Sequence, residues 1–251
     1  DILVIPEIYG PDFERIGPGI PKIIFNQNAF YTFDEYPMDC ESTAGNYISE
    51  YIKACLVVSD NNQELLQTIF PQLSIFKVSP YVNLKIFNYS ETKRNVLSYM
   101  PRKNSKHAKH IINALRFKGL LKNLEVVAID NMSEEDVAKT LKESLIFLSL
   151  GFPEGFSLPP AEAMACGAIA VGYHGQGGAE YFKPEWSYPA DIWDTKKIIS
   201  DIEMITEAWE KNPAMLKERM RKASDYITKN YGEEKIADEL VFSRESIMSL
   251  D

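Results

Sequence analysis

Two glutamates with seven residues between them stand in a segment that is rich in glycine and proline. Glu154 precedes Gly155, and Glu162 follows the pair Pro159-Pro160. Carboxylates accept hydrogen bonds from hydroxyl groups, whereas glycine-rich backbone and a helix N-terminus favour anions such as a diphosphate. A ligand that has both hydroxyl groups and a phosphate could bind to the carboxylates through the hydroxyls and to the backbone N–H groups through the phosphate. The alternative for Glu162 is a carboxylate that only complements the dipole of the helix that carries it.

A group of cations forms the second candidate. Arg102 and Lys106 stand four residues apart, directly after an apolar run that ends at Met100. Two fixed cations at this place could hold a diphosphate and stabilise the charge that it gains as a leaving group. Lys103 competes for this role. The other interpretation of the cluster, which also includes Lys109, is the solvated start of a helix.

The elements that must position these residues are short apolar strands that alternate with helix-length amphipathic segments. Continuous apolar runs are typical of parallel strands that are covered on both faces. Their alternation with helices predicts an α/β fold with Rossmann-type, doubly wound parallel sheets. The predicted strands are residues 2–5, 22–26, 54–59, 74–78, 96–100, 125–129, 145–150 and 168–173.

The strand over residues 145–150 leads into the loop that contains Glu154. Proline is favoured in a first helical turn, so we expect a helix from Pro159-Pro160 that ends before Gly167. The loop then lies at the carboxyl end of a parallel strand, where open α/β sheets bind their ligands.

Three regions of the chain are predicted to have different roles. Residues 79–95 contain Pro80, show no clear period and are predicted to join two α/β units. We therefore expect a partial N-terminal Rossmann-like domain over residues 1–80 and a second Rossmann-like domain over residues 81–230. The C-terminal helix, residues 231–251, is expected to pack back on the N-terminal part.

Composition excludes several classes of protein. The chain has 251 residues, with 27 Lys and Arg against 36 Asp and Glu and a formal net charge of −9. This balance disfavours a nucleic-acid partner, because neutralising phosphates requires a basic surface. No apolar run reaches the roughly 20 residues needed to span a bilayer.

The cysteines and histidines do not form a metal or disulfide pattern. Three scattered cysteines, Cys40, Cys55 and Cys166, indicate a reducing, cytoplasmic setting. No carboxylate or cysteine stands at ligand spacing from a histidine, and we expect His107 and His110 on the surface of a helix.

The stretch EGFSLPPAEAMACG resembles the Glu-x7-Glu signature of family 4 retaining glycosyltransferases (glycosyl transferases group 1), which have the GT-B fold. The one departure is Ser157, where the family usually has glycine. A following loop with Gly177, Gly178 and Glu180 resembles the Gly-Gly loop of the family with one residue fewer. The positions that match the signature are Glu154, Gly155, Phe156, Leu158, Pro159, Glu162, Ala163, Met164, Ala165 and Gly167.

The resemblance implies a GT-B-like chain with a complete C-terminal donor-binding domain and an abbreviated N-terminal domain. The implied donor is a nucleotide sugar such as a UDP- or GDP-sugar, and the implied acceptor is a glycan, a lipid or a protein. Transfer would retain the anomeric configuration without a metal or a further cofactor, and the sequence has no Asp-x-Asp motif. Membrane association is not indicated, because residues 1–90 carry 5 Lys and Arg against 11 Asp and Glu.

The resemblance also assigns roles to residues. Arg102 and Lys106 would hold the diphosphate, Glu154 would bind the sugar, and Glu162 would bind the ribose. Arg102, Lys106 and Glu154 form the expected catalytic set. The other residues expected to bind the donor are Gly155, Phe156, Ser157 and Leu158, through backbone N–H groups, and Ile129 and Asp130, near the base. A turn-capping role is the alternative for Asp130.

Two other functions stay open at the level of sequence. One is a nucleotide-sugar-binding module without catalysis. The other is a sugar-nucleotide epimerase with the GT-B fold, which would require acid and base residues in the N-terminal part. The earliest histidine in the chain is His107, which disfavours an epimerase.

Overall fold

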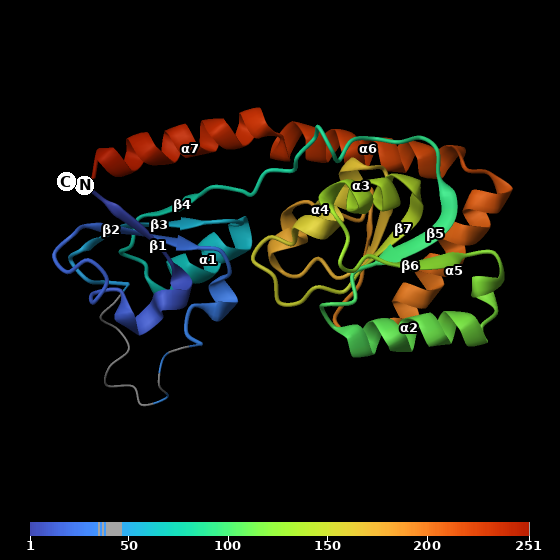
Figure 1. The fold of residues 1–251 in the computed structure, drawn as a ribbon, viewed down its shortest axis with the longest axis horizontal. Helices are drawn as coiled ribbons and strands as arrows, with labels where there is room; N and C mark the ends of the chain where they lie inside the picture. Colours follow the sequence, from blue (N-terminus) through green and yellow to red (C-terminus); the bar gives the residue numbers. More distant parts are fainter. Residues whose placement is uncertain (35, 37, 39–46, 251) are drawn as a thin grey trace. The chain divides into compact units, whose positions relative to one another are not determined.

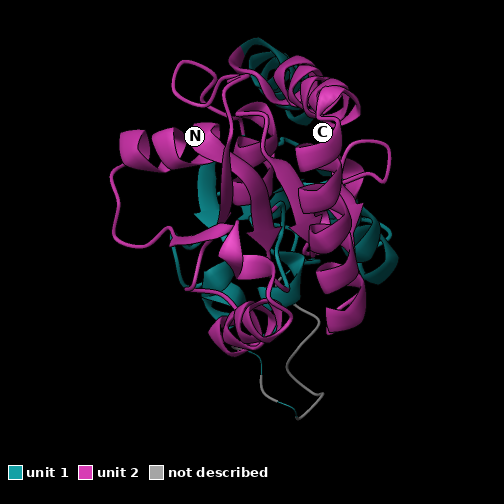
Figure 2. Cartoon of the chain, turned by 90° about the vertical axis from the view of Figure 1, so that its right-hand side faces the viewer, with its two compact units in different colours: residues 1–80, 153–156, 234–251 teal, residues 81–152, 157–233 magenta. Residues whose placement is uncertain are grey.

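The computed structural model describes residues 1–34, 36, 38 and 47–250, and they form two compact units, each with its own parallel β-sheet (Figure 2). The first unit consists of residues 1–80, 153–156 and 234–251, and the second of residues 81–152 and 157–233. Cys40 lies outside the described residues, whereas Cys55 and Cys166 are buried free thiols.

The sheet of the first unit has four parallel strands in the order β1-β2-β3-β4. Ile5, Ile24, Cys55 and Ile75 are register partners across the four strands, and all four are buried, so they form the central row of the core. The elements are β1 (Leu3–Pro6), η1 (Glu7–Asp12), β2 (Lys22–Asn26), η2 (Ala29–Tyr31), β3 (Ile52–Val57), α1 (Asp60–Ile69), β4 (Ile75–Lys77) and α7 (Glu233–Met248).

The sheet of the second unit has five parallel strands in the order β6-β5-β7-β8-β9. Its centre is β7, in which every residue is buried. The elements are β5 (Arg94–Tyr99), α2 (Ser105–Phe117), η3 (Leu120–Lys122), β6 (Glu125–Ala128), α3 (Glu134–Glu143), β7 (Ser144–Ser149), α4 (Leu158–Ala165), β8 (Ile169–Gly172), η4 (Gly177–Glu180), β9 (Tyr188–Pro189), α5 (Thr195–Lys211) and α6 (Ala214–Tyr231).

The direction of the chain reverses inside this second sheet. It moves from β5 outward to β6, returns to β7 on the other side of β5, and continues to β8 and β9. Helices α2 and α5 pack together on one face, and α4 contacts both α3 and α6 on the other (Figure 1). The reversal makes the carboxyl ends of β5 and β7 a topological switch point, the usual ligand-binding position in such sheets.

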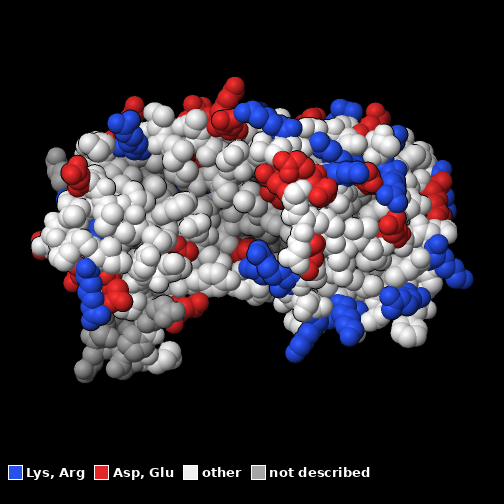
Figure 3. Space-filling model, viewed as in Figure 1, with Lys and Arg blue, Asp and Glu red and all other residues white. Residues whose placement is uncertain are grey.

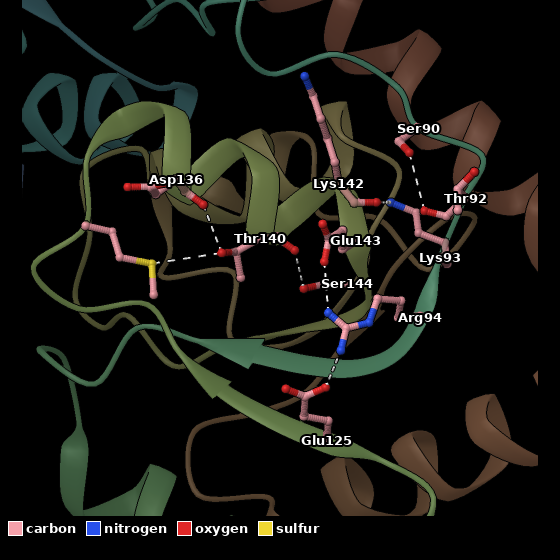
Figure 4. A network of polar contacts seen from close by, with 11 residues as sticks. Ser90, Thr92, Lys93, Arg94, Glu125, Asp136, Thr140, Lys142, Glu143 and Ser144 are labelled. Atoms are coloured by element: carbon pink, nitrogen blue, oxygen red, sulfur yellow. Dashed lines mark hydrogen bonds and ion pairs between the residues drawn. The ribbon is translucent and has the colours of Figure 1, made fainter.

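A partly buried lysine fixes the far ends of the two helices that begin at this edge. Lys93 donates a hydrogen bond to the carbonyl oxygen of Lys142 at 2.7 Å, near the C-terminal end of α3 (Figure 4). It donates a second one to the carbonyl oxygen of Cys166 at 2.8 Å, at the C-terminal end of α4. A cation at a helix C-terminus is favourable, although burial lowers the pKa of Lys93 to about 7. Next to it, Arg94 pairs with both Glu125 and Glu143, which joins β5, β6 and the end of α3 (Figure 4).

Most predicted elements are present. All eight predicted strands appear, with their ends shifted by at most two residues, and the helix predicted at Pro159-Pro160 is α4. The two-residue strand β9 was not predicted, because a strand of that length has no periodicity. None of the described helices is both long enough and apolar enough to cross a membrane.

Candidate functional site

Backbone strain marks one edge of the second unit. Each of its five strands is followed, within eight residues, by a non-glycine residue with positive φ, and these are the five such residues in the described chain. Strained backbone persists where the surrounding structure enforces it and clusters at functional sites. The carboxyl edge of this sheet is therefore the strongest candidate site. The residues are Asn104 (φ 52°), Asn131 (51°), Ser157 (71°), Gln176 (80°) and Trp193 (67°).

The loop after β7 leads into α4 through a left-handed residue. Ser157 has φ 71° and ψ 70°, and its side chain makes no cap bond to the helix. The hydroxyl of Tyr181 donates a hydrogen bond to the carbonyl oxygen of Ser157 and so stabilises this left-handed conformation. Pro159 and Pro160 lack N–H groups, so the free donors of this helix start are those of Ser157 and Leu158.

Only glycine fits at position 155, because the backbone of another segment lies too close for a side chain. A Cβ atom at this position would lie 1.9 Å from the carbonyl oxygen of Gln27, in the first unit to which residues 153–156 also belong. Glu154 and Phe156, on either side, make further interactions, and Phe156 is buried. The backbone at Gly155 thus lies directly against the backbone at Gln27, and any side chain at Gly155 would displace the loop.

Glu162 lies in α4 with its carboxyl group largely removed from solvent. Burial raises the pKa of Glu162 to about 7, and the negative charge of Glu134 at the start of α3 raises it further in the same direction. A carboxyl whose pKa is raised by burial and by a second acid, at a strand-end edge, is a typical candidate for ligand binding. Glu134 was not singled out from the sequence, because nothing there shows that α3 and α4 pack together.

The loop after β5 carries the predicted cations. Arg102 and Lys106 are both exposed, on the loop and in the first turn of α2. Between them, Asn104 adopts a left-handed conformation and donates from Nδ2 to the carbonyl oxygen of Leu150 at 2.6 Å. This bond joins the loop after β5 to the end of β7, on both sides of the switch point. Asparagine tolerates positive φ better than most residues, so Asn104 was recognisable from sequence as a turn former.

His107 is buried, which shows that its expected position on the surface of a helix is wrong. It was expected on the surface of a helix, but its side chain is 1% exposed and both ring nitrogens are hydrogen-bonded. Nδ1 lies 2.8 Å from the hydroxyl of Tyr173, and Nε2 lies 2.8 Å from Oγ1 of Thr195. The ring of Trp193 packs on the imidazole with centroids 4.3 Å apart. Burial lowers the pKa of His107, and the neighbouring His110 lowers it further.

The loop after β8 is a short 3₁₀ turn, η4, that starts after Gln176. Gly177 and Gly178 are buried in it, and His174 accepts a hydrogen bond at Nδ1 from the N–H of Gln176 at 3.1 Å. Glu180 accepts a hydrogen bond from the hydroxyl of Tyr231 in α6 at 2.7 Å. The Gly-Gly segment predicted from the resemblance is thus anchored at the same edge of the sheet as α4.

Ile129 and Asp130, the two residues predicted to contact the base of the nucleotide, come directly after β6. Ile129 is 5% exposed and donates its N–H to the carbonyl oxygen of Tyr99 at 2.8 Å, whereas Asp130 is exposed. The structure thus brings the predicted residues Arg102, Lys106 and Glu162 to the same edge of the second sheet as this pair. Within the described residues, no group of three or more His, Cys, Asp or Glu side chains could hold a metal ion.

The α/β fold with two parallel sheets is the fold of GT-B glycosyltransferase structures, as predicted. The model of the family described as glycosyl transferases group 1 matches residues 104–223, which include the loop after β7 and all of α4.

Individual relatives agree with this class. The chain is 27% identical over 182 residues to an Alpha-1,6-glucosyltransferase of Actinobacillus pleuropneumoniae serotype 7 (strain AP76), a match over 70% of this chain and 53% of that protein. It resembles S. aureus TarM in complex with Fondaparinux, alpha-GlcNAc-glycerol and UDP, with a TM-score of 0.70, 14% identity, and coverage of 96% and 54%. Anabaena HepE in complex with UDP gives a TM-score of 0.71 at 11% identity, with coverage of 97% and 79%.

The chain spans about half the length of the curated relative and of TarM. The residues that match the family, 104–223, include all five non-glycine residues with positive φ.

Proposed function

We propose that this chain is part of a glycosyltransferase that binds a nucleotide sugar at the carboxyl edge of the second sheet. The observation that carries the proposal is the start of α4. A left-handed Ser157, free N–H groups and the partly buried carboxyl of Glu162 follow the central strand β7 there. This arrangement offers donors to an anion and an acceptor to hydroxyls within two helical turns.

The proposed roles divide between the two sides of the switch point. Arg102 and Lys106 hold the diphosphate, and they stabilise it most when it leaves with added negative charge. Gly155, Phe156, Ser157 and Leu158 present backbone N–H groups, Glu154 binds the sugar, and Glu162 binds the ribose. Ile129 and Asp130, directly after β6, contact the base. The UDP in the complexes of TarM and HepE supports a UDP-sugar as the donor.

The proposed reaction is transfer with retention and without a metal. The bond between the anomeric carbon and the diphosphate oxygen breaks, and the acceptor hydroxyl attacks from the same face. The hydroxyl proton passes to the departing diphosphate. Arg102 and Lys106 then compensate the negative charge of the departing diphosphate, which a metal ion would otherwise do. The acceptor is a glycan, a lipid or a protein, and the description of the Actinobacillus relative supports a glucosyl group as the transferred sugar.

The experiment that tests this function is NMR observation of UDP-glucose with the protein, with and without a chelator. The proposal predicts slow release of UDP and, as the first sugar signal, the α-anomer, unchanged by the chelator. First appearance of the β-anomer would contradict retention, and loss of turnover with the chelator would contradict metal independence. Donor binding without any release would identify the alternative, a nucleotide-sugar-binding module without catalysis.

A further inference from the structure

The cations of this acidic chain are unevenly distributed. Residues 101–124 contain seven Lys and Arg and no Asp or Glu, within a protein whose net charge is −9. This segment runs from the loop after β5 through α2 and η3. The cations are Arg102, Lys103, Lys106, Lys109, Arg116, Lys118 and Lys122.

In helix α2 the cations lie on one side and the buried residues on the other. His107, Ala108, Ile111 and Leu115 are buried against the second unit. The opposite side, which we call the basic face of α2, follows the spacing of seven residues that keeps side chains in one line. It consists of Lys109, His110, Arg116 and Phe117, all exposed, and is continued beyond the helix by Lys122.

Few carboxylates neutralise this face. Lys118, just past the helix, pairs with Glu203 of α5. No ion pair within the described residues engages Lys106, Lys109 or Lys122, and Arg116 bonds only to the side chain of Asn113 at 2.6 Å. In Figure 3, blue side chains gather where Figure 1 places α2, and no red side chain lies among them.

An aromatic side chain stands at the end of the basic face. Phe117 is 92% exposed, the most exposed aromatic residue described. The apolar face of α2 is packed inside the second unit, so only Phe117 could enter a membrane, while the outward cations could meet an anionic surface. The cations meet lipid phosphates, and the ring enters the boundary between headgroups and acyl chains.

We propose that the basic face of α2 docks on an anionic phospholipid surface. Attraction to such a surface acts over about one Debye length, roughly 10 Å at 0.1 M salt, so the local patch counts for more than the distant negative charge. A soluble polyanion is the less favoured partner, because it would leave the ring of Phe117 in water. The acidic residues 1–90 do not carry this surface, which belongs to the second unit.

The test is sedimentation of the full chain with vesicles of phosphatidylglycerol and phosphatidylcholine, compared with vesicles of phosphatidylcholine alone. We expect binding only to the anionic vesicles at about 0.1 M salt, and its loss at about 0.5 M salt. The variant with Lys109→Glu, Arg116→Glu and Lys122→Glu should bind roughly 100-fold more weakly. The single variant Phe117→Ala should bind about tenfold more weakly. None of these residues has a proposed role in donor binding.

A matched control carries the same change of charge elsewhere. Lys211→Glu, Lys222→Glu and Lys229→Glu alter exposed lysines of α5 and α6 and should leave vesicle binding unchanged. Equal loss in the control would overturn the proposal, as would absence of binding to anionic vesicles. Binding to a soluble sulfated polysaccharide, but not to vesicles, would overturn it in favour of a polymeric partner. These results do not depend on donor binding, so the two proposals can fail separately.

Discussion

The hydroxyl of Tyr173 lies 2.8 Å from Nδ1 of His107 and also accepts a hydrogen bond from the N–H of Trp193. With the ring proton of His107 on Nε2, facing Thr195, every polar atom in this chain of bonds has a partner. The contact joins the first turn of α2, which carries Lys106, to the ends of β8 and β9. A buried histidine thus positions a predicted diphosphate-binding element.

Removal of the Tyr173 hydroxyl should destabilise the second unit. Tyr173→Phe leaves the N–H of Trp193 and Nδ1 of His107 without their partner, and an unsatisfied buried group costs about 1–3 kcal/mol. Urea unfolding measures the effect. Tyr188→Phe is the control, because its ring packs against Arg219 and no hydrogen bond of its hydroxyl is found in the described structure. Equal stability of the two variants would contradict the role given to this bond.

The left-handed backbone at position 157 predicts a stabilising substitution. Ser157→Gly should raise the free energy of unfolding by roughly 1 kcal/mol, because a non-glycine residue is strained at φ 71°. Thermal unfolding would show a rise in Tm of about 2–4 °C for a chain of this size. An unchanged or lowered Tm would indicate that the side chain of Ser157 makes a contribution that outweighs the strain.

Gly155 should not tolerate even the smallest side chain. Gly155→Ala would place a Cβ atom 1.9 Å from the carbonyl oxygen of Gln27, so the loop must move. We expect a cost of about 1–3 kcal/mol or more, together with weaker donor binding in calorimetry. Gly19→Ala is a control for a glycine with open space around it, although its positive φ adds some strain. Full stability and full binding of Gly155→Ala would contradict the close approach.

The raised pKa of Glu162 predicts a pH dependence of stability. Its folded-state pKa, about 7, lies above the ordinary value of 4.5, so the folded chain binds more protons between these values. The contribution of Glu162 therefore destabilises the fold as pH rises from about 4.5 to 7. Glu162→Gln should be more stable than the parent above pH 7, by up to roughly 3 kcal/mol, and equally stable below pH 4.5. Urea unfolding at pH 4.5 and pH 8 tests this, and an equal difference at both values would refute the assignment.

The sequence predicted the parallel sheets and the loop of Glu154 because both have local signatures. Apolar runs indicate buried strands, and the pair Pro159-Pro160 marks the start of α4. Contacts between distant segments have no such signature. The approach of Glu134 to Glu162, the bonds of His107 to Tyr173 and Thr195, and the insertion of Lys93 between two helix ends all depend on the sheet order. The two-residue strand β9 is likewise formed by its neighbour β8.

Ser157 shows how a departure from a motif is explained only by structure. In the sequence it is a mild substitution for glycine, and in the structure it occupies the left-handed position that makes glycine usual there.

Calorimetric titration with UDP-, GDP-, ADP- and dTDP-sugars tests the central claim most directly. We predict that the chain binds a UDP-sugar selectively, that Arg102→Ala abolishes this binding, and that Glu162→Ala weakens it at least tenfold. Lys211→Ala, an exposed lysine near the end of α5, should bind as the parent does. Absence of binding to every nucleotide sugar, or binding that survives both Arg102→Ala and Glu162→Ala, would contradict a donor site at the carboxyl edge of the second sheet.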